Sequence, residues 1–263
     1  MCVSHAWKSQ YFIEQDAALP KLKALAEGGD NAAQLTLADY YEDDEIPANY
    51  NPSEAMRLYQ ASADQGNPHA QYRLGMMYYW GEIVTRDLTE AFKWIRKAAA
   101  QNYSQAQGME KTIVYIIGTI ANAKAANAEA EYELGELYLL GAGVQQSDVE
   151  AMDWWHKAAD QGYPDAIFRV ARSFEREGRM TPQEMEDALF WLNLAGKAGD
   201  KEGYLIAHNM ESWVPAEQIS AAYTRVHEWQ AAHPNQPENG PKSKFYTDLF
   251  PAHETSDTFH AAH

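Results

Sequence analysis

Acidic side chains form the densest group of potential ligands in this chain. They are consecutive in the sequence: Glu42, Asp43, Asp44 and Glu45. A calcium site takes acids at spaced positions that wrap around the ion, often with a glycine that turns the loop. Four acids in a row without a glycine do not fit that pattern. Binding to arginine or lysine side chains of a partner fits better, and a solvated loop is the other interpretation that the run allows.

The sequence patterns of common catalytic and metal sites are not found. The segment GAGV at 141–144 lacks the Gly-Lys-Ser/Thr that completes a phosphate-binding loop. No Cys-x-x-Cys or His-Glu-x-x-His pair signals zinc, and no Gly-x-Ser-x-Gly elbow signals a serine hydrolase. The single cysteine, Cys2, lies at the extreme terminus, where a reactive thiol rarely has the electropositive setting that it needs. We therefore expect no catalytic residue, no metal ion and no cofactor.

The charge of the chain limits which partners it can bind. Its 263 residues carry a formal net charge of −17 at pH 7. Such a surface repels phosphate backbones, which argues against nucleic acid, and attracts basic proteins. The acids gather in two blocks: residues 1–66 hold 4 Lys/Arg against 11 Asp/Glu, and residues 131–203 hold 7 against 15. The most apolar run, at 112–123, has 12 residues and is too short to span a bilayer, which takes about 20.

An internal repeat indicates which elements would position these side chains. Counted from four alanines, an apolar residue recurs four positions on, a small residue five positions on and an aromatic residue eight positions on. These steps trace one face of a helix, and the small residue lets a second helix approach closely. In that order, the residues are Ala33, Ala70, Ala130 and Ala166; Leu37, Leu74, Leu134 and Val170; Ala38, Gly75, Gly135 and Ala171; and Tyr41, Tyr78, Tyr138 and Phe174.

A second helical pattern follows each first one and is counted from Ala55, Ala91, Ala151 and Ala188. Its third position carries Trp94, Trp154 and Trp191, which we interpret as core residues, whereas Trp155 has no place in the pattern. The position eleven residues on is Gly, Asn, Gly and Gly, and these residues tolerate the left-handed conformation that ends a helix. The chain therefore predicts helix pairs that recur about every 36 residues, with stops at Gly66, Asn102, Gly162 and Gly199.

The regular spacing breaks once. Ala70 and Ala130 lie 60 residues apart, which is one period of 36 plus a remainder of 24 that is too short for a full unit. We expect an all-α fold organised as an N-terminal segment (1–17), a repeat array (18–203, irregular at 103–129), capping helices (204–233) and an extended coil tail (234–263). The capping helices would cover the inner face of the last repeat, which has no neighbour.

Gly- and Ala-rich helix pairs of this length resemble the Sel-one-like repeat (SLR), a branch of the tetratricopeptide-repeat superfamily. The resemblance is carried by AQYRLGMMYYWG (70–81) with TEAFKWIRKAAAQN (89–102), and by 130–162, which matches almost every family position. It implies an α/α superhelical solenoid whose concave face binds proteins. It also implies roles in scaffolding, adaptor work, host interaction or toxin neutralisation, and some bacterial members are immunity proteins against secreted phospholipase effectors.

The resemblance also implies that the first helix of each pair lines the concave face, so its non-core positions are candidates for partner contact. Tyrosine is over-represented at interface hot spots because it buries area at low entropic cost. An alternative for the position that holds Tyr72 and Tyr132 is packing against the previous repeat. The predicted partner-binding residues are Glu42, Asp43, Asp44, Glu45, Tyr72, Tyr79, Tyr132, Glu133 and Arg169.

Three functional hypotheses follow. The first is a non-catalytic module that binds one basic partner protein, in its specific form a bacterial immunity protein that neutralises a toxin or secreted effector. The second is a cytosolic adaptor or regulatory scaffold, and the third is a hydrolase built from scattered histidines and acids. A processed bacterial lipoprotein begins at its lipidated cysteine, so Cys2 is a candidate lipid anchor of a periplasmic protein. An ordinary start at Met1 implies a cytoplasmic one.

Overall fold

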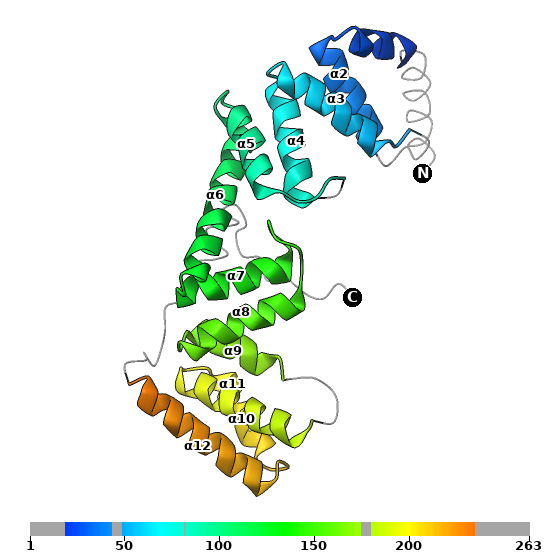
Figure 1. Ribbon diagram of the computed structural model, residues 1–263. Coiled ribbons are helices and arrows are strands. Elements are labelled where there is room, and N and C mark those ends of the chain that lie inside the picture. Colours follow the sequence, from blue (N-terminus) through cyan, green and yellow to red (C-terminus); the bar gives the residue numbers. More distant parts are fainter. Residues whose placement is uncertain (1–18, 44–48, 82, 175–179, 235–263) are drawn as a thin grey trace, which may run out of the picture. The chain divides into compact units, whose positions relative to one another are not determined.

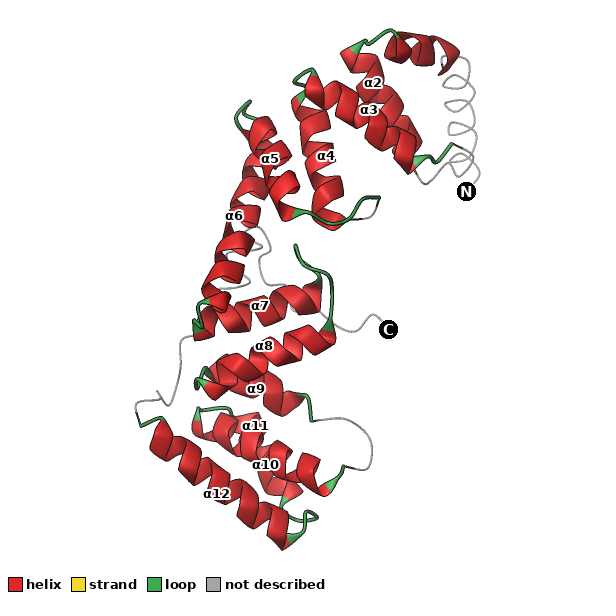
Figure 2. Cartoon of the chain, in the orientation of Figure 1, coloured by secondary structure: helices red, strands yellow, loops and turns green. Residues whose placement is uncertain are grey.

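The computed structural model describes residues 19–43, 49–81, 83–174 and 180–234, and in these ranges it contains helices and no strand (Figures 1 and 2). The chain divides into two compact units, residues 1–114 and 115–263. The prediction of an all-α fold built from helix pairs is confirmed. The candidate anchor Cys2, the N-terminal segment and the tail beyond Pro234 lie outside the described residues.

Helix pairs follow one another along each unit. In the first unit, a helix over 19–27 precedes the pairs α2 (Asn31–Glu42) with α3 (Pro52–Asp64) and α4 (Pro68–Trp80) with α5 (Leu88–Ala99). The irregular segment is largely one helix of 21 residues, α6 (Ser104–Lys124). The second unit continues with α7 (Ala128–Leu140), α8 (Asp148–Asp160), α9 (Pro164–Arg172), α10 (Pro182–Lys197), α11 (Lys201–Met210) and α12 (Ala216–Ala232).

The predicted helix stops are confirmed by the backbone. The φ angles of Gly66, Asn102, Gly162 and Gly199 are 93°, 64°, 85° and 100°, and this left-handed region is the one that glycine enters at little steric cost. Ala126, which follows α6, has the same left-handed conformation with a φ of 61°, although its Cβ disfavours it. The irregular segment therefore ends with the same turn as a regular repeat.

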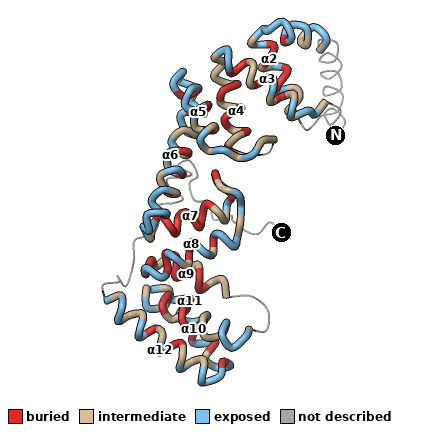
Figure 3. Tube along the Cα trace, viewed as in Figure 1, coloured by how far each residue is buried: buried red, intermediate tan, exposed pale blue. Residues whose placement is uncertain are grey.

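Close contact between the two helices of a pair depends on the small residue of the first helix. A Cβ added to Gly135 would stand 2.4 Å from Trp155 Nε1, and one added to Gly75 would stand 2.7 Å from Ile95 Cγ1. Trp155 and Ile95 hold the same position of the second helix, four residues after Ala151 and Ala91, and both are buried. Buried residues recur along the helices of both units (Figure 3). Trp155 thus has a place in the repeat that the sequence pattern missed.

Only two of the three tryptophans interpreted as core residues are buried. Trp94 and Trp191 lie in the core, but Trp154 is half-buried, and Lys157 Nζ lies 3.5 Å from the centroid of its ring. The interpretation of Trp154 as a core residue is wrong. The neighbouring Trp155 fills that core, because only its side chain faces the notch left by Gly135.

Amide side chains at the same repeat positions form hydrogen bonds within each pair and to the helix before it, a series that we call the glutamine ladder. Gln65 Nε2 donates to Gln34 Oε1 at 2.8 Å, and Gln101 Nε2 donates to Gln71 Oε1 at 2.9 Å. Gln34 and Gln71 each donate in turn to the backbone carbonyl eight residues earlier, at 3.2 and 3.1 Å. The ladder satisfies polar groups where the first helix of one pair meets the two second helices beside it.

The third ladder position holds a carboxyl group instead of an amide. Gln161 Nε2 donates to Glu131 Oε2 at 2.5 Å, as in the other repeats, but an ionised Glu131 has no N–H to donate to the carbonyl eight residues before it. Burial raises the pKa of the Glu131 carboxyl above its ordinary value of 4.5, and the hydrogen bond from Gln161 opposes this rise. Protonation would restore the missing donor.

We predict that Gly135→Ala destabilises the chain by about 2 kcal/mol, because the added methyl group collides with the buried indole of Trp155. Thermal or denaturant unfolding measures the loss. Gly118→Ala in α6 is the matched control, since a Cβ there meets nothing within 4 Å and alanine is the better helix former by up to about 1 kcal/mol. Equal stability of the two variants would contradict the close-packing account.

We predict that Glu131→Gln stabilises the chain near neutral pH by about 1 kcal/mol, because it restores a ladder donor. The folded chain holds the Glu131 proton more tightly than the unfolded chain does. Its contribution to stability is therefore fully present below the ordinary pKa and is lost as pH rises through the raised pKa of the folded state. Unfolding free energies across this pH range should show the decline in the wild type and not in Glu131→Gln. Glu129→Gln, on the exposed side of the same helix, should keep the decline.

Candidate protein-binding surface

Three of the predicted contact residues lie inside the fold. Tyr79 and Tyr132 are 4 % and 7 % exposed, and burial raises the pKa of the Tyr79 hydroxyl to about 12. Tyr132 packs against Tyr163 with ring centroids 5.3 Å apart, and Glu133 accepts a hydrogen bond from Thr119 at 3.2 Å. Because a buried side chain cannot reach a partner in the folded protein, the prediction of direct contact through these three residues is corrected.

Tyr72, another predicted contact residue, is also partly covered by the fold. It is half-buried, and its ring lies 5.5 Å from the ring of Tyr103, as the ring of Tyr132 lies beside that of Tyr163. Tyr163 is the N-cap residue of α9, and Tyr103 directly precedes α6. This repeat position therefore packs against a neighbour, as the alternative interpretation held, but the neighbour is the following element and not the previous repeat.

Glu42 and Arg169 take part in ion pairs between successive first helices. Glu42 pairs with Arg73 of α4, and Arg169 Nη2 lies 2.7 Å from Oε2 of the fully buried Glu136 of α7. The Arg169 guanidinium also stands over the Trp155 ring, 5.3 Å from its centroid. These two predicted residues join repeats, and neither presents a free charge to solvent.

The acidic loop is only partly described. Asp43 is exposed, whereas Asp44 and Glu45 lie outside the described residues. The Tyr59 hydroxyl lies 2.6 Å from both Asp39 Oδ1 and Glu42 Oε2, and burial together with these two carboxylates raises the pKa of that hydroxyl. The acids at the end of α2 are therefore held in part by the fold.

Four of the exposed aromatic and aliphatic side chains belong to α11, to α12 and to the turn between them, where sequence reasoning placed no site. Tyr204 and Leu205 lie on α11, Trp213 in the turn that follows and Tyr223 on α12. Their exposed fractions are 58 %, 63 %, 52 % and 37 %. We call these four residues the terminal aromatic surface. Tyrosine and tryptophan exposed to this extent are the side chains that most often become hot spots of protein interfaces.

Polar contacts order part of the terminal aromatic surface. The Tyr223 hydroxyl donates to Glu211 Oε1 at 2.5 Å, and this bond together with burial raises the pKa of the hydroxyl to about 12. His208 Nδ1 lies 3.5 Å from Glu211 Oε2, and the His208 ring stacks on Tyr204 with centroids 6.3 Å apart. A carboxylate thus stands among aromatic faces, an arrangement that suits a guanidinium or ammonium group.

The repeat register explains why these residues are exposed. Tyr204 and Leu205 hold the positions that Gln71 and Tyr72 hold in α4, one and two residues after the buried small residue. In α4 and α7 the element that follows the pair covers the second of these positions, with Tyr103 on Tyr72 and Tyr163 on Tyr132, but the repeat array ends after α11. An open groove of about 560 Å³ between the end of α10 and the start of α11 is lined by both residues. The sequence could have indicated these exposed positions, because the repeat spacing continues from Ala166 to Gly203.

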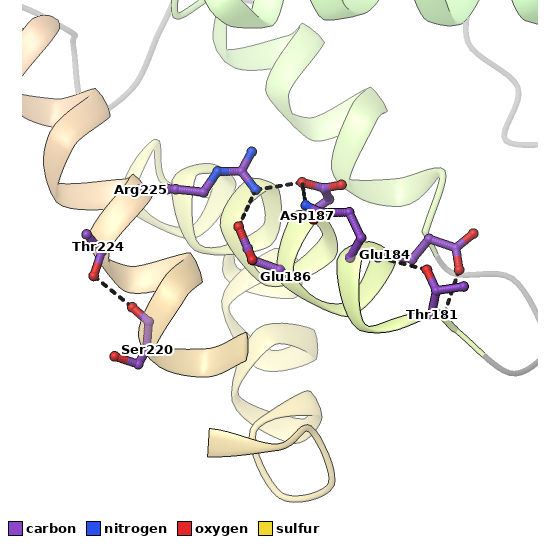
Figure 4. A network of polar contacts seen from close by, with 8 residues as sticks. Thr181, Glu184, Glu186, Asp187, Ser220, Thr224 and Arg225 are labelled. Carbon is purple, nitrogen blue, oxygen red and sulfur yellow. Dashed lines mark hydrogen bonds and ion pairs between the residues drawn. The ribbon is translucent and has the colours of Figure 1, made fainter. Parts of the chain in front are cut away.

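One arginine joins the last helix to α10 by polar contacts (Figure 4), in addition to the buried Ala222 and Val226 of α12. Arg225 Nη1 of α12 lies 2.9 Å from Glu186 Oε1 and 2.6 Å from Asp187 Oδ1 of α10, and the guanidinium stands 4.4 Å from the centroid of the Phe190 ring. The start of α10 is fixed by a capping box between Thr181 and Glu184. These contacts fix α12 on α10 and so fix the position of Tyr223.

Two further searches of the described residues bear on function. They hold no group of three or more His, Cys, Asp or Glu side chains placed to bind a metal ion. Within the same ranges, no helix has the length and apolar character that crossing a bilayer takes.

Comparison with known proteins gives relatives that are longer than this chain. The chain is 30 % identical over 169 residues to chitin synthase regulatory factor 2 of Schizosaccharomyces pombe, covering 56 % of this chain and 33 % of that protein. It is 30 % identical over 154 residues to an exopolysaccharide production negative regulator of Rhizobium leguminosarum, covering 57 % and 52 %. The chain therefore spans about half or less of the length of these curated relatives.

A solved structure and a family profile complete the comparison. The structure is a protective antigen of uropathogenic Escherichia coli with an SLR fold, 23 % identical, covering 91 % of this chain and 52 % of that chain with a TM-score of 0.38. The profile of the Sel1 repeat matches residues 31–67, 68–103, 128–163 and 164–200, and it leaves out the segment occupied by α6. The matched residues make up more than half of the chain, which therefore belongs to the Sel1 repeat family of protein-binding modules.

Proposed function

We propose that this chain is a regulatory adaptor that binds one basic partner protein through the terminal aromatic surface. The observation that carries the proposal is the exposure of Tyr204 and Leu205 at repeat positions that are covered in earlier repeats. Apolar side chains that gather on one part of a surface mark interaction sites. The partner would pack against the end of the array in the place that a following repeat would occupy.

The charge of the chain supports a basic partner. Glu211 lies within the terminal aromatic surface and bonds Tyr223, and the whole chain carries −17. Long-range attraction of this kind speeds the encounter with a positively charged protein, and Tyr or Trp rings then hold Arg or Lys side chains through cation–π contacts. The partner's contact patch is therefore expected to contain arginine or lysine together with apolar residues.

The regulatory part of the proposal is supported by the relatives. Their names describe one as a regulatory factor of chitin synthase and one as a negative regulator of exopolysaccharide production. Both names refer to the making of a polysaccharide. An enzyme of polysaccharide synthesis is accordingly the first class of partner to test.

Neutralisation of a toxin or secreted effector is the second candidate function. It is favoured by the two acidic blocks, residues 1–66 and 131–203, which suit a basic toxin whose active site they would cover. Growth of cells that express the toxin-like product of a neighbouring gene separates the two candidates. Rescue by this chain supports neutralisation, whereas binding without rescue supports the adaptor.

We predict that Tyr204→Ser and Trp213→Ser each weaken partner binding by about 2 kcal/mol, which is about 30-fold in Kd. Unfolding free energies should stay within about 0.5 kcal/mol of the wild type, because both side chains are largely exposed. Calorimetry with the partner identified by mass spectrometry from affinity-purified complexes measures the change.

The matched control is Val149→Ser on α8, which is 73 % exposed and lies outside the terminal aromatic surface. It should leave Kd unchanged. Binding of every variant to a basic partner should weaken as salt rises, since salt screens exposed charges. Unchanged Kd for both aromatic variants would show that the partner binds elsewhere, and salt-independent binding would contradict the basic partner.

A further inference from the structure

The helix α11 has the register of a first helix, but two of its exposed positions are buried in every earlier first helix. Counted from Gly203, Tyr204 is one residue on and His208 is five residues on. Tyr204 is 58 % exposed, and the side chain of His208 is 74 % exposed. The residues at these two positions in α2, α4, α7 and α9 are all buried: Gln34, Gln71, Glu131 and Ile167 at the first, and Ala38, Gly75, Gly135 and Ala171 at the second.

In the earlier repeats, these two positions belong to the face that the second helix of the pair covers. Gly135 of α7 lies against Trp155 of α8, and Gln71 of α4 accepts a hydrogen bond from Gln101, which follows α5. The helix that follows α11 is α12, but it packs chiefly on α10. A helix from outside the described residues therefore has room on this face of α11, which we call the pair face and define as Tyr204, His208 and Glu211.

The pair face is aromatic at one end and acidic at the other. The ring of His208 stacks on Tyr204 with centroids 6.3 Å apart, and His208 Nδ1 lies 3.5 Å from Glu211 Oε2. The open groove of about 560 Å³ that Tyr204 and Leu205 line adjoins the aromatic end. Such a face suits a short amphipathic helix that is apolar near Tyr204 and carries a cation near Glu211.

One segment beyond the described residues has these properties, although the proline, glycine and asparagine residues around it predict coil. Residues 242–250 read KSKFYTDLF and lie between Pro241 and Pro251. Proline fits the first turn of a helix and disfavours helical geometry in the residue before it, so this spacing is typical of a short helix. In such a helix, the apolar residues share one face with one lysine: Lys242, Phe245, Tyr246, Leu249 and Phe250.

The length and the charge of this segment match the pair face. A helix of nine residues is about 14 Å long, and the ten residues of α11 span about 15 Å. In the pair of α4 and α5, Gln71 meets Gln101 and Gly75 meets Ile95, so the two helices run in opposite directions. The same register on α11 places Leu249 at Tyr204, Phe245 at His208 and Lys242 at Glu211. Opposite charges then meet at one end and apolar side chains at the other.

The connection to this segment is long enough for such docking. Pro234, the last described residue, lines a pocket of about 340 Å³ together with Lys197 and Ala198 at the end of α10. The helix α11 begins at Lys201, three residues later. Eight residues lead from Pro234 to Lys242 and span up to about 27 Å. That reach exceeds the length of α11, so Lys242 can lie at the far end of the helix, beside Glu211.

We propose that residues 242–250 form a helix on the pair face of α11 and supply the second helix of the last pair. A helix of nine residues is too short to be stable alone, so it forms where Tyr204 and His208 cover its apolar side. The docked segment also covers part of the terminal aromatic surface, and a partner that binds there must displace it. Only this competition rests on the proposed function.

Disulfide formation in the full chain tests the docking without any partner. Cys2→Ser removes the native thiol, and His208→Cys is combined with Tyr246→Cys on the apolar side of the segment or with Thr247→Cys on its polar side. With oxidised glutathione as the oxidant, we expect the intramolecular disulfide to form about tenfold faster with Tyr246→Cys, because only a docked helix holds that side against α11. Mass spectrometry of the intact and digested chain measures both rates.

Two outcomes of this measurement would overturn the proposal. Equal rates for the two cysteine pairs would show that the segment does not dock with one side, since a tail that stays free presents both neighbours alike. Disulfide-linked dimers in dilute solution would show that a second copy of the chain supplies the segment.

Charge reversal tests the direction of the docked helix. Lys242→Glu should slow the disulfide of the Tyr246→Cys pair about threefold, as suits an exposed ion pair, and the further change Glu211→Lys should restore the rate. Lys244→Glu, on the polar side of the segment, is the matched control and should leave the rate unchanged. Equal slowing by both lysine changes would overturn the antiparallel placement.

Partner binding tests the competition separately. Leu249→Ser with Phe250→Ser removes apolar contacts of the docked segment and should tighten partner binding about tenfold, because the binding surface is then open in more of the molecules. An unchanged Kd beside a clear disulfide preference would count against partner binding at this surface and would leave the docking in place. Equal disulfide rates beside weakened binding in Tyr204→Ser would count against the docking alone.

Discussion

The whole fold depends on how closely two helices approach within each pair. That approach is set by one small residue, because the side chains of Ile95 and Trp155 occupy the space where Gly75 and Gly135 have no Cβ. An isolated helix of 12 or 13 residues is marginal in water and gains its stability from packing. Only when the pair has closed does it present a face on which the next pair can stack. Side-chain choices elsewhere in the repeat follow from this contact.

A second layer of interactions joins one pair to the next, and it tolerates exchange. The glutamine ladder holds amide groups in two joints, an amide and a carboxyl group in the third, and Ile167 with Ala198 in the last. The helix pairs form at all four of these positions, so the fold does not depend on the hydrogen bonds of the ladder. Two positions of the ladder have other residue types. Glu131 carries a carboxyl group with a raised pKa, and a pocket lies beside Ala198. Departures from a repeat are thus the places to look for specific properties.

The end of the array is a second kind of departure. A repeat position that is covered when another element follows is exposed at the end of the array, and Leu205 holds that position. Part of the terminal aromatic surface therefore arises from ordinary repeat positions, whereas Trp213 and Tyr223 come from the turn after α11 and from α12. The proposed role of this surface is consistent with a family of protein-binding modules.

The sequence by itself determined the helix pairs, their stops and the break in the period. Each of these is local: Gly66 or Asn102 ends a helix because of its own φ preference, and a helical face shows in the spacing of Leu74 and Gly75. Tertiary structure decided which aromatic residues face solvent. Tyr132 is covered by Tyr163, whereas Leu205, which holds the same repeat position, is 63 % exposed. Trp155 lies in the core and Trp154 at its edge for the same reason, since exposure depends on what packs against a residue from elsewhere in the chain, and spacing along one helix cannot report that.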